Sequence, residues 1–472
     1  MSIGRAFAHL ADEAPDAVAV RCGDEVLTRR ELDLRSNRVA RAWSDRVGHD
    51  DLVTISLPNG VDFVVACAAT WKLGATPQPL SPRIGPGERG AILELARPAL
   101  VVDVASVEGG LEASDDDSPL PDLAATSWKA PTSSGSTGRP KIVRAAAPAT
   151  VDPDGRVAPF VPREAVQMVA GPLFHAAPFV YAMRGLMTGH ELVVLPRFDA
   201  TAALEAIQRH GVTWTMLVPT MMHRIWRLDA DVRESYDVSS LESMLHMGAR
   251  CAPWLKRAWL DWLGPERVVE VYAGTESQGL AMITGVEWLE HPGSVGRGIS
   301  GSEFAVRRPD GTRCEPGEVG EIVMRRDGPP TYTYVGAEAD VRDGWHTLGD
   351  AGWIDPDGFL FVGDRLDDVI VTGGVKVQPA DVEAVLEEHP DVRSAIAVGR
   401  DDDERGQVVH AVVDVDAAEV TEADLRAWTR ERLDPEKRPR SWQLVREPLR
   451  ADTGKVRRSE WQTDSSSTRG NP

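Results

Sequence analysis

The order of hydrophobic and polar positions in the first third of the chain alternates between helical and strand-like spacing. The pattern Thr28-x-x-Glu31 is a capping box, and the apolar residues that follow it up to Trp43 recur at helical spacing. Residues 52–57 and 99–102 are short apolar runs typical of buried strands, and residues 63–72 are an apolar run typical of a helix. Strands that alternate with helices predict a parallel sheet with helices on both faces.

The pattern changes in the last third of the chain. Short strands punctuated by glycine and aspartate are predicted around residues 280–360, and a compact unit of strands and helices follows Gly363. Its predicted elements are a strand at residues 369–372, a helix at 380–388, strands at 394–398 and 408–415, and a helix opened by Thr421.

These patterns predict an α/β protein made of two unequal regions. Residues 1–365 are expected to form a large N-terminal region of doubly wound sheets with a β-rich subdomain. Residues 366–462 are expected to form a smaller, mobile α+β domain, and the Ser/Thr/Gly-rich residues 463–472 a disordered tail.

Composition narrows the class of protein. The chain has 472 residues, of which 42% are apolar and 26% charged, and its formal net charge of −21 argues against a nucleic-acid partner. No apolar run reaches the ~20 residues of a membrane-spanning helix, and no export signal precedes Asp12. The four cysteines show no Cys-x-x-Cys pair, which favours neither a zinc site nor a disulfide framework. A cytoplasmic location without a membrane span is therefore expected.

A segment rich in glycine and hydroxyl side chains, Thr132-Ser-Ser-Gly-Ser-Thr-Gly-Arg-Pro-Lys141, could bind phosphate groups. Glycines let backbone N–H groups converge on an anion, hydroxyls add donors, and the lysine supplies charge. It is not a Walker loop, because Arg139-Pro140 separates glycine from lysine and Ile142 stands where Ser or Thr would hold magnesium. A plain surface turn is the alternative, which the Pro-Lys ending disfavours. The candidate phosphate-binding residues are Thr132, Ser133, Ser134, Gly135, Ser136, Thr137, Gly138 and Lys141.

Further motifs follow this loop in a fixed order: Tyr272-Ala-Gly-Thr-Glu276, Thr347-Leu-Gly-Asp350, Asp364-Arg-Leu-Asp-Asp-Val-Ile370, Gly373-Gly374 and Thr453-Gly-Lys455. Together with the loop they resemble the signatures of the AMP-forming superfamily of acyl- and aryl-CoA synthetases, adenylation domains and luciferases. The resemblance covers nearly the whole chain. It implies ATP, Mg²⁺ and coenzyme A as the cofactors, and a small-molecule carboxylic acid or its acyl-adenylate as the partner.

The resemblance also implies roles for single residues. Tyr272 would offer a flat face to adenine, and Asp350 would accept hydrogen bonds from the ribose diol. Glu276 is the implied magnesium ligand, because an oxygen donor suits that hard cation. Lys455 would bridge the substrate carboxylate and the α-phosphate as negative charge develops. The other implied positions are Thr275 at the α-phosphate, Gly248, Ala249 and Arg250 beside adenine, and Arg365 at the sugar.

Two half-reactions need two arrangements of the site. The carboxylate would first attack the α-phosphorus of ATP with release of pyrophosphate, and a thiol would then attack the acyl-adenylate. Asp367 matches the family's hinge between the regions. Rotation about it would withdraw Lys455 and bring the Gly373-Gly374 pair towards the adenylate, where small residues leave room for a pantetheine arm. A simple tight turn is the alternative reading of the two glycines.

The nature of the acid is indicated by the segment Pro172-Leu-Phe-His-Ala-Ala-Pro-Phe179. Amino-acid-activating members carry an aspartate here, whereas this chain has His175, so a simple carboxylic acid is favoured. His175 is either a substrate-gating residue or a structural core histidine. Ala176 and Ala177 leave space, and the Met-rich run at residues 213–222 lies where the family builds its acyl pocket. The wording of these segments resembles bile-acid-CoA ligase-type members, which implies a bulky, steroid- or terpenoid-like acid.

Two departures from the family pattern keep alternatives open. Arg250 stands where relatives carry a small residue or proline, and Ala273 replaces a common glycine, so both could narrow the nucleotide pocket. One alternative is a thioesterification-only member that acts on an adenylate made elsewhere. A second is a freestanding adenylation enzyme that loads a carrier protein. A third is a non-catalytic acyl or nucleotide sensor, against which the retained Lys141, Glu276 and Lys455 argue.

Overall fold

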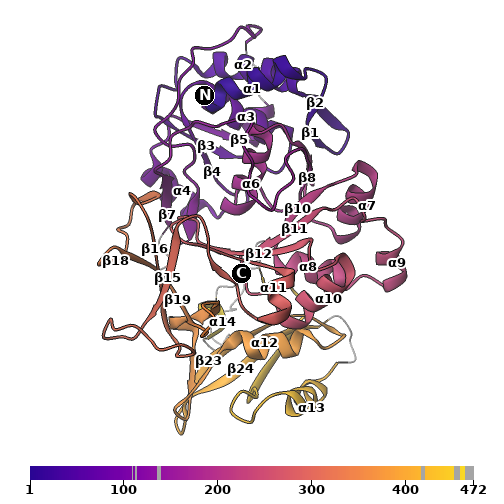
Figure 1. Ribbon diagram of the computed structural model, residues 1–472, viewed down its shortest axis with the longest axis vertical. Helices are drawn as coiled ribbons and strands as arrows, with labels where there is room; N and C mark the ends of the chain where they lie inside the picture. Colours follow the sequence, from indigo (N-terminus) through magenta and orange to yellow (C-terminus); the bar gives the residue numbers. More distant parts are fainter. Residues whose placement is uncertain (109, 112–113, 135–139, 416–419, 451–457, 463–472) are drawn as a thin grey trace, which may run out of the picture.

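The computed structural model describes residues 1–108, 110–111, 114–134, 140–415, 420–450 and 458–462. The chain forms a large N-terminal region and a smaller C-terminal unit that lies below it in Figure 1. Lys455, Gly135, Ser136, Thr137, Gly138 and the expected tail at residues 463–472 lie outside the described residues. The expected fold class, an α/β chain with a β-rich section and a smaller α+β unit, is confirmed.

The first layer of the large region is a three-stranded parallel sheet in the order β4–β3–β5. Its strands are β3 (Leu52–Ser56), β4 (Thr76–Pro79) and β5 (Leu100–Asp103), and the helices beside it are α1 (Ile3–Glu13), α2 (Arg29–Trp43), α3 (Val61–Lys72) and α4 (Pro86–Ala96). The predicted capping box is present, because Thr28 and Glu31 each accept a hydrogen bond from the other's backbone N–H. The strand β4 contains Pro77 and Pro79, and its place at the sheet edge explains why prolines are tolerated there.

The second layer is a nine-stranded sheet whose central strands are parallel, in the order β14–β13–β12–β11–β10–β8–β9–β1–β2. The central strands are β8 (Val166–Val169), β10 (Trp214–Leu217), β11 (Ser243–Met247) and β12 (Val268–Ala273), with β9 (Glu191–Val194), β1 (Val18–Cys22), β2 (Glu25–Thr28), β13 (Leu280–Thr284) and β14 (Arg297–Gly298) further out. Every residue of β10 and β11 is buried, as expected for parallel strands covered on both faces. The helices of this layer include α6 (Ala176–Met187), α7 (Ala200–His210), α8 (Pro219–Trp226) and α10 (Pro253–Leu263).

The β-rich section consists of two small antiparallel sheets. One contains β15 (Ser302–Arg307), β16 (Gly320–Arg326), β18 (Val341–Arg342), β19 (Trp345–Ile354) and β20 (Leu360–Arg365). The other pairs β6 (Thr132–Ser134) and β7 (Pro140–Ala145) with β17 (Tyr332–Val335), which comes from nearly 190 residues later in the chain. The predicted phosphate-binding segment therefore spans the β6–β7 pair.

The C-terminal unit begins after the short 3-10 helix Leu366–Asp368. Its sheet contains β21 (Ile370–Thr372), β22 (Val375–Val377), β23 (Val392–Asp402), β24 (Gly406–Val415) and β25 (Ser441–Val445), and its main helices are α12 (Pro379–Glu387) and α13 (Glu422–Arg432). These elements agree with the predicted ones, including the helix opened by a capping box at Thr421. The unit has an apolar core of its own, formed by α12, α13 and the sheet.

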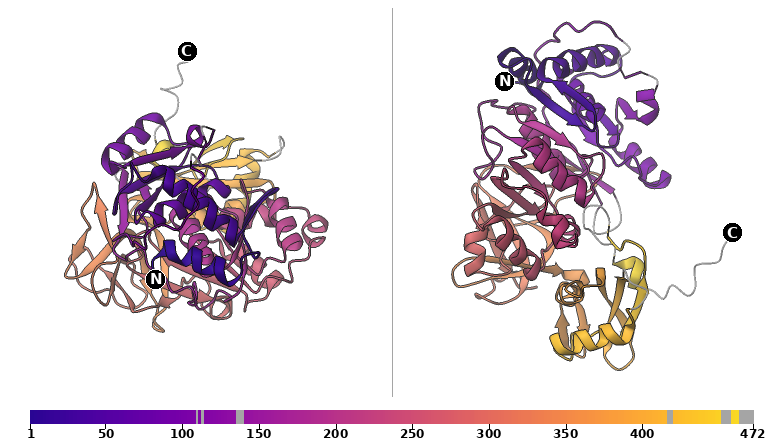
Figure 2. Two further views of the ribbon diagram at one scale, coloured as in Figure 1. Left: turned by 90° about the horizontal axis from the view of Figure 1, so that it is seen from above. Right: turned by 90° about the vertical axis from the view of Figure 1, so that its right-hand side faces the viewer.

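The C-terminal unit lies at one end of the large region and contacts it through α12 and β20 (Figure 2). Among the described helices, none combines the length and the apolar character that crossing a bilayer requires.

Candidate active site

A cleft of about 2490 Å³ lies between the two regions and brings most of the described candidate residues together. Its walls come from the β6–β7 pair, the N-terminus of α6, the ends of β11 and β12, and the β19–β20 pair. The candidate residues along it are Thr132, Ser133, Lys141, His175, Gly248, Ala249, Arg250, Tyr272, Thr275, Glu276, Asp350 and Arg365. The side chains of Ser134 and Asp367 lie outside what the structure describes.

One group in the cleft is built around the carboxylate of Glu276, which is 6% exposed. Lys141 Nζ lies 3.3 Å from Glu276 Oε1, and Tyr334 Oη donates a hydrogen bond of 2.5 Å to the same oxygen. Lys141 also donates to Tyr334 Oη at 2.7 Å. Burial raises the pKa of Tyr334, and its hydrogen bond to Glu276 raises it further. The site thus joins a fixed carboxylate to a cation, and such an oxygen donor would suit Mg²⁺.

A second group in the cleft joins three residues that the sequence assigns to the base and the ribose. Tyr272 Oη donates a hydrogen bond of 2.6 Å to Asp350 Oδ2, and Arg365 Nε lies 3.9 Å from Asp350 Oδ1. The antiparallel register of β19 and β20 places Asp350 directly opposite Arg365. Burial raises the pKa of Tyr272 well above its usual value, and Asp350 raises it further. The phenol is therefore a neutral donor that orients the carboxylate.

The candidate acyl wall of the cleft lies between α6 and the nine-stranded sheet. His175 is the N-cap of α6, and its ring lies 4.7 Å from that of Phe174. Ala177 and Tyr181, one helical turn apart, pack against a buried apolar cluster that includes Met216 of β10 and Met247 of β11. Small side chains on the helix and flexible thioethers on the sheet leave an apolar, adaptable wall.

The two glycines of the predicted pantetheine face are placed elsewhere in this arrangement. Gly373 and Gly374 form the turn between β21 and β22, with φ of +57° and +84°, and they are not among the residues that line the cleft. By contrast, Arg450 and Arg458, which flank the segment that contains Lys455, do line it. The described orientation therefore turns Arg450 and Arg458 of the C-terminal unit, and not the Gly373–Gly374 turn, towards the cleft.

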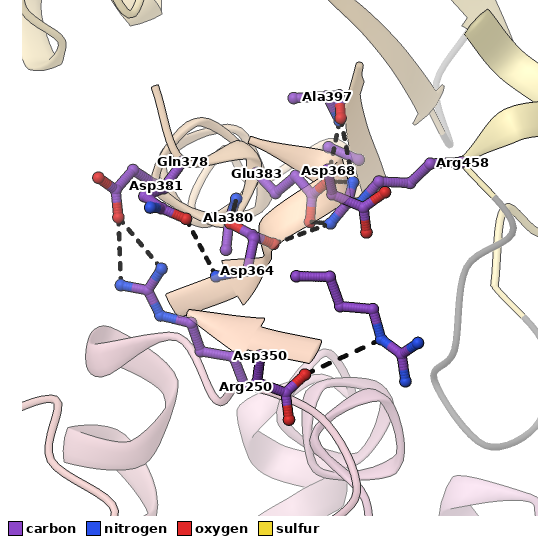
Figure 3. Close-up of polar contacts among 12 residues, drawn as sticks. Arg250, Asp350, Asp364, Asp368, Gln378, Ala380, Asp381, Glu383, Ala397 and Arg458 are labelled. Atoms are coloured by element: carbon purple, nitrogen blue, oxygen red, sulfur yellow. Dashed lines mark hydrogen bonds and ion pairs between the residues drawn. The ribbon is translucent and has the colours of Figure 1, made fainter. Parts of the chain in front are cut away.

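The side chain of Arg250 points towards the C-terminal unit. Its guanidinium reaches across to the C-terminal unit and pairs with Asp381 (Figure 3). Arg250 still lines the cleft, so whether it narrows the adenine pocket stays a prediction, while its guanidinium is held by Asp381.

Sequence reasoning missed two residues of the cleft. Tyr334 belongs to the Tyr332-Thr-Tyr334 alternation, whose period of two predicts both rings on one face of a strand, so a signal existed. Lys129 is 5% exposed, and its Nζ donates to the carbonyl oxygen of Thr275 at 3.3 Å. Burial, with a contribution from Arg184, lowers the pKa of Lys129 to about 8. A lysine in the otherwise apolar Trp128–Pro131 run is the only hint the sequence offers.

The fold and the cleft define an adenylate-forming enzyme built from a large region and a smaller C-terminal unit. The chain belongs to the AMP-binding enzyme family, which its residues 7–330 match, and residues 381–455 match the AMP-binding enzyme C-terminal domain.

Three comparisons illustrate the kinship. A feruloyl-CoA synthase of Amycolatopsis sp is 32% identical over 95% of this chain and 96% of its own length. A 2-succinylbenzoate–CoA ligase of Bacillus licheniformis is 31% identical, over 92% and 94%. The o-succinylbenzoate CoA synthetase of Bacillus subtilis superposes with a TM-score of 0.81 at 26% identity, over 97% and 98%, in its complex with the acyl-adenylate OSB-AMP. In complex with ATP and a magnesium ion it gives a TM-score of 0.80 at 25% identity, over 96% and 98%.

These relatives identify the reaction class. The chain is an acid–thiol ligase that forms an acyl-CoA through an acyl-adenylate, with ATP, Mg²⁺ and coenzyme A as its small-molecule partners beside the carboxylic acid. The buried carboxylate of Glu276 fits the implied metal, and the Tyr272–Asp350 pair fits a nucleoside.

Proposed function

We propose that this ligase activates a bulky, largely apolar carboxylic acid and transfers its acyl group to coenzyme A. The observation that supports this substrate class is the candidate acyl wall, where Ala177 and Tyr181 of α6 pack against a cluster that includes Met216 and Met247 of the sheet. A wide pocket with adaptable walls suits a rigid ring system better than a short chain. The names of the relatives, which refer to feruloyl and 2-succinylbenzoate acids, are consistent with a cyclic acid. Steroid- and terpenoid-like acids are the first group to test.

We assign the residues of the cleft as follows. Tyr272, Asp350 and Arg365 hold the nucleoside, and the Thr132–Lys141 segment holds the phosphates. Glu276 would hold Mg²⁺, which supplies charge neutralisation of the phosphates when it is bound. Thr275 would contact the α-phosphate, and His175, the N-cap of α6 that lines the cleft, would gate the carboxylic acid.

In the proposed first half-reaction, a carboxylate oxygen bonds to the α-phosphorus of ATP and the bond to pyrophosphate breaks. Lys455 stabilises the negative charge that develops between carboxylate and phosphate. In the second half-reaction, the thiol sulfur of coenzyme A bonds to the acyl carbon, AMP leaves, and the thiol proton passes to solvent.

The proposed division of the chain is an N-terminal domain at residues 1–365 and a C-terminal domain at 366–462, with Asp367 as the hinge. Its support is the short 3-10 helix Leu366–Asp368 between β20 and β21, together with the separate apolar core of the C-terminal unit. A rotation at this point would exchange Arg450 and Arg458 for the Gly373–Gly374 turn at the cleft.

The experiment that tests the function measures three products separately. The protein is incubated with ATP, Mg²⁺ and matched panels of cyclic and linear acids, with and without coenzyme A, while pyrophosphate, AMP and thioester are quantified. We expect pyrophosphate from cyclic acids without coenzyme A, and thioester only with it. Equal activity on short linear acids would contradict the substrate proposal. Pyrophosphate without any thioester would favour a carrier-protein acceptor, and thioester from supplied adenylate alone would favour the non-adenylating alternative.

A further inference from the structure

The contact between the two regions includes an ion pair whose members come from opposite sides. Arg250 follows β11 in the large region, and Asp381 lies in the first turn of α12 in the C-terminal unit. Arg250 Nη1 and Nη2 both donate to Asp381 Oδ1 at 3.1 Å (Figure 3). The side chains are 35% and 30% exposed, so water and salt can reach the pair.

A second arginine of the large region holds the other end of the same helix. Arg227 follows α8, and its Nη1 donates to the carbonyl oxygen of His389, beyond the C-terminus of α12, at 3.4 Å. The helix is therefore contacted at both ends by guanidinium groups of the large region. Such a two-point contact fixes the direction of α12 and, through it, the orientation of the C-terminal unit.

The orientation that these contacts fix is the one in which Arg450 and Arg458 line the cleft and the Gly373–Gly374 turn does not. We infer that Arg250 is a positioning residue for the first half-reaction. Its pairing with Asp381 stabilises the adenylate-forming orientation, and the pair breaks before thioester formation. This inference rests on the proposed rotation about Asp367.

The chain offers a matched control for this ion pair. Asp381 has a second cationic partner, Lys437, whose Nζ donates to Asp381 Oδ2 at 3.1 Å and whose side chain is 34% exposed. Lys437 belongs to the same C-terminal unit as Asp381, so its pairing does not cross between the regions. Lys437→Ala removes an ion pair of equal length and exposure from the same carboxylate without touching the contact between the regions.

The first test compares half-reactions in Arg250→Ala, Lys437→Ala and the charge-swapped Arg250→Asp/Asp381→Arg protein. Arg250→Ala should slow adenylate formation about 2–5-fold, the range expected for an exposed pair, while thioester formation from synthetic acyl-adenylate is unchanged or faster. Lys437→Ala should leave the ratio of the two rates unchanged, and the charge swap should restore it. The KM for ATP is measured in each variant. A raised KM that the charge swap does not restore would show that Arg250 acts on the nucleotide, which would overturn the inference.

The second test needs no substrate, so it separates failure of this inference from failure of the proposed function. Spin labels are placed at the exposed positions of Val232→Cys in the large region and Leu444→Cys in the C-terminal unit, with the half-buried Cys22 and Cys314 replaced by serine. Arg250→Ala should broaden or shift the distance distribution between the labels, and Lys437→Ala should not. An unchanged distribution in Arg250→Ala, or equal changes in both variants, would overturn the inference even if the enzyme forms the expected thioester.

Discussion

Two ion pairs whose cations lie only a few residues apart in the sequence differ in how deeply they are buried. Lys256 of α10 pairs with Glu270 of β12 inside the large region, and the two side chains are 1% and 9% exposed. Arg250 pairs with Asp381 across to the C-terminal unit, and those side chains are about a third exposed. The buried pair cannot exchange with water, so it holds one body together, whereas the exposed pair can open at little cost. Burial thus raises the cost of opening an ion pair, and the exposed pair is the one of these two that can change between half-reactions.

The charged groups inside the C-terminal unit are also buried and paired, like Lys256 and Glu270. Glu383 of α12 is 4% exposed and accepts hydrogen bonds from Arg450 and Arg458, which flank the segment that carries Lys455. Burial alone would raise the pKa of Glu383, but Arg458 and Arg450 lower it to about 2. Arg458 also pairs with Asp364 at 3.2 Å, so the network crosses to β20 of the large region. Glu383, Arg450 and Arg458 belong to one unit and should move together, whereas the Arg458–Asp364 pair crosses between the regions and would have to open in a rotation about Asp367.

The largest expected effect on stability comes from breaking the buried pair. Lys256→Met should lower the free energy of unfolding by about 3–5 kcal/mol, because it leaves the Glu270 carboxylate buried without its cation. Burial already raises the pKa of Glu270, and the lost Lys256 no longer opposes this, so the variant should recover stability as the pH falls and Glu270 takes up a proton. Urea denaturation at several pH values measures both effects. In the Lys256→Met/Glu270→Gln control, most of the loss should disappear, and an equal loss in both proteins would contradict the explanation.

The next effect is on catalysis and tests the division of labour between the half-reactions. Lys455→Ala should slow adenylate formation by roughly 10²–10³-fold, because the loss of a donor to developing charge costs ~3–4 kcal/mol. Thioester formation from synthetic acyl-adenylate should change little. Asp367→Pro should slow that second step instead, since proline fixes φ and would obstruct the rotation. Both half-reactions are timed in both variants, and equal losses in the two halves for Lys455→Ala would refute the division.

Much of the local structure could be predicted because it depends on neighbours in the sequence. The capping boxes at Thr28 and Thr421 and the strands and helices after Gly363 were found from spacing alone. The strand β4 was missed because its two prolines indicate a loop, and only the edge position in the sheet makes them acceptable. The order of the nine-stranded sheet, in which β1 lies beside β9, depends on contacts across some 170 residues, and no local pattern encodes it.

In the candidate site, too, sequence patterns predicted individual residues but not the contacts between distant parts of the chain. Motifs identified Tyr272, Asp350 and Glu276, but not that Tyr272 donates to Asp350 from a different sheet. The partner of Arg250 lies more than a hundred residues away on a helix that resembles any other amphipathic helix in sequence. Residue types can be assigned from a motif, whereas pairings between regions require the arrangement of the chain in space.

Lys129 is an intermediate case between the two ion pairs, because it is buried but only partly paired. Its pKa of about 8 means that the folded protein releases the proton near pH 8, whereas the unfolded chain keeps it to about 10.5. The unfolded state binds more protons in this window, so stability should rise with pH from 8 to 10.5. Lys129→Met should therefore stabilise the protein by about 1–3 kcal/mol at pH 7, and by less at pH 10.

The measurement is the free energy of unfolding of both proteins across this pH range. The exposed Lys376→Met serves as the control, and its effect should stay below about 0.5 kcal/mol. A destabilised Lys129→Met protein at pH 7 would mean that the contact with Thr275 outweighs the cost of burying the ammonium group.

The smallest expected effect returns to the exposed pair. Arg250→Ala should lower the free energy of unfolding by less than about 1 kcal/mol, although the ion pair that it removes has a short N–O distance of 3.1 Å. Raising the salt concentration from 0.05 to 0.5 M should reduce even this difference, while the loss in Lys256→Met should persist because salt does not reach the buried carboxylate. Urea denaturation of both variants at the two salt concentrations makes the comparison. If Arg250→Ala were as destabilising as Lys256→Met, the contact between the regions would be as permanent as the core, and the C-terminal unit could not turn without unfolding part of the chain.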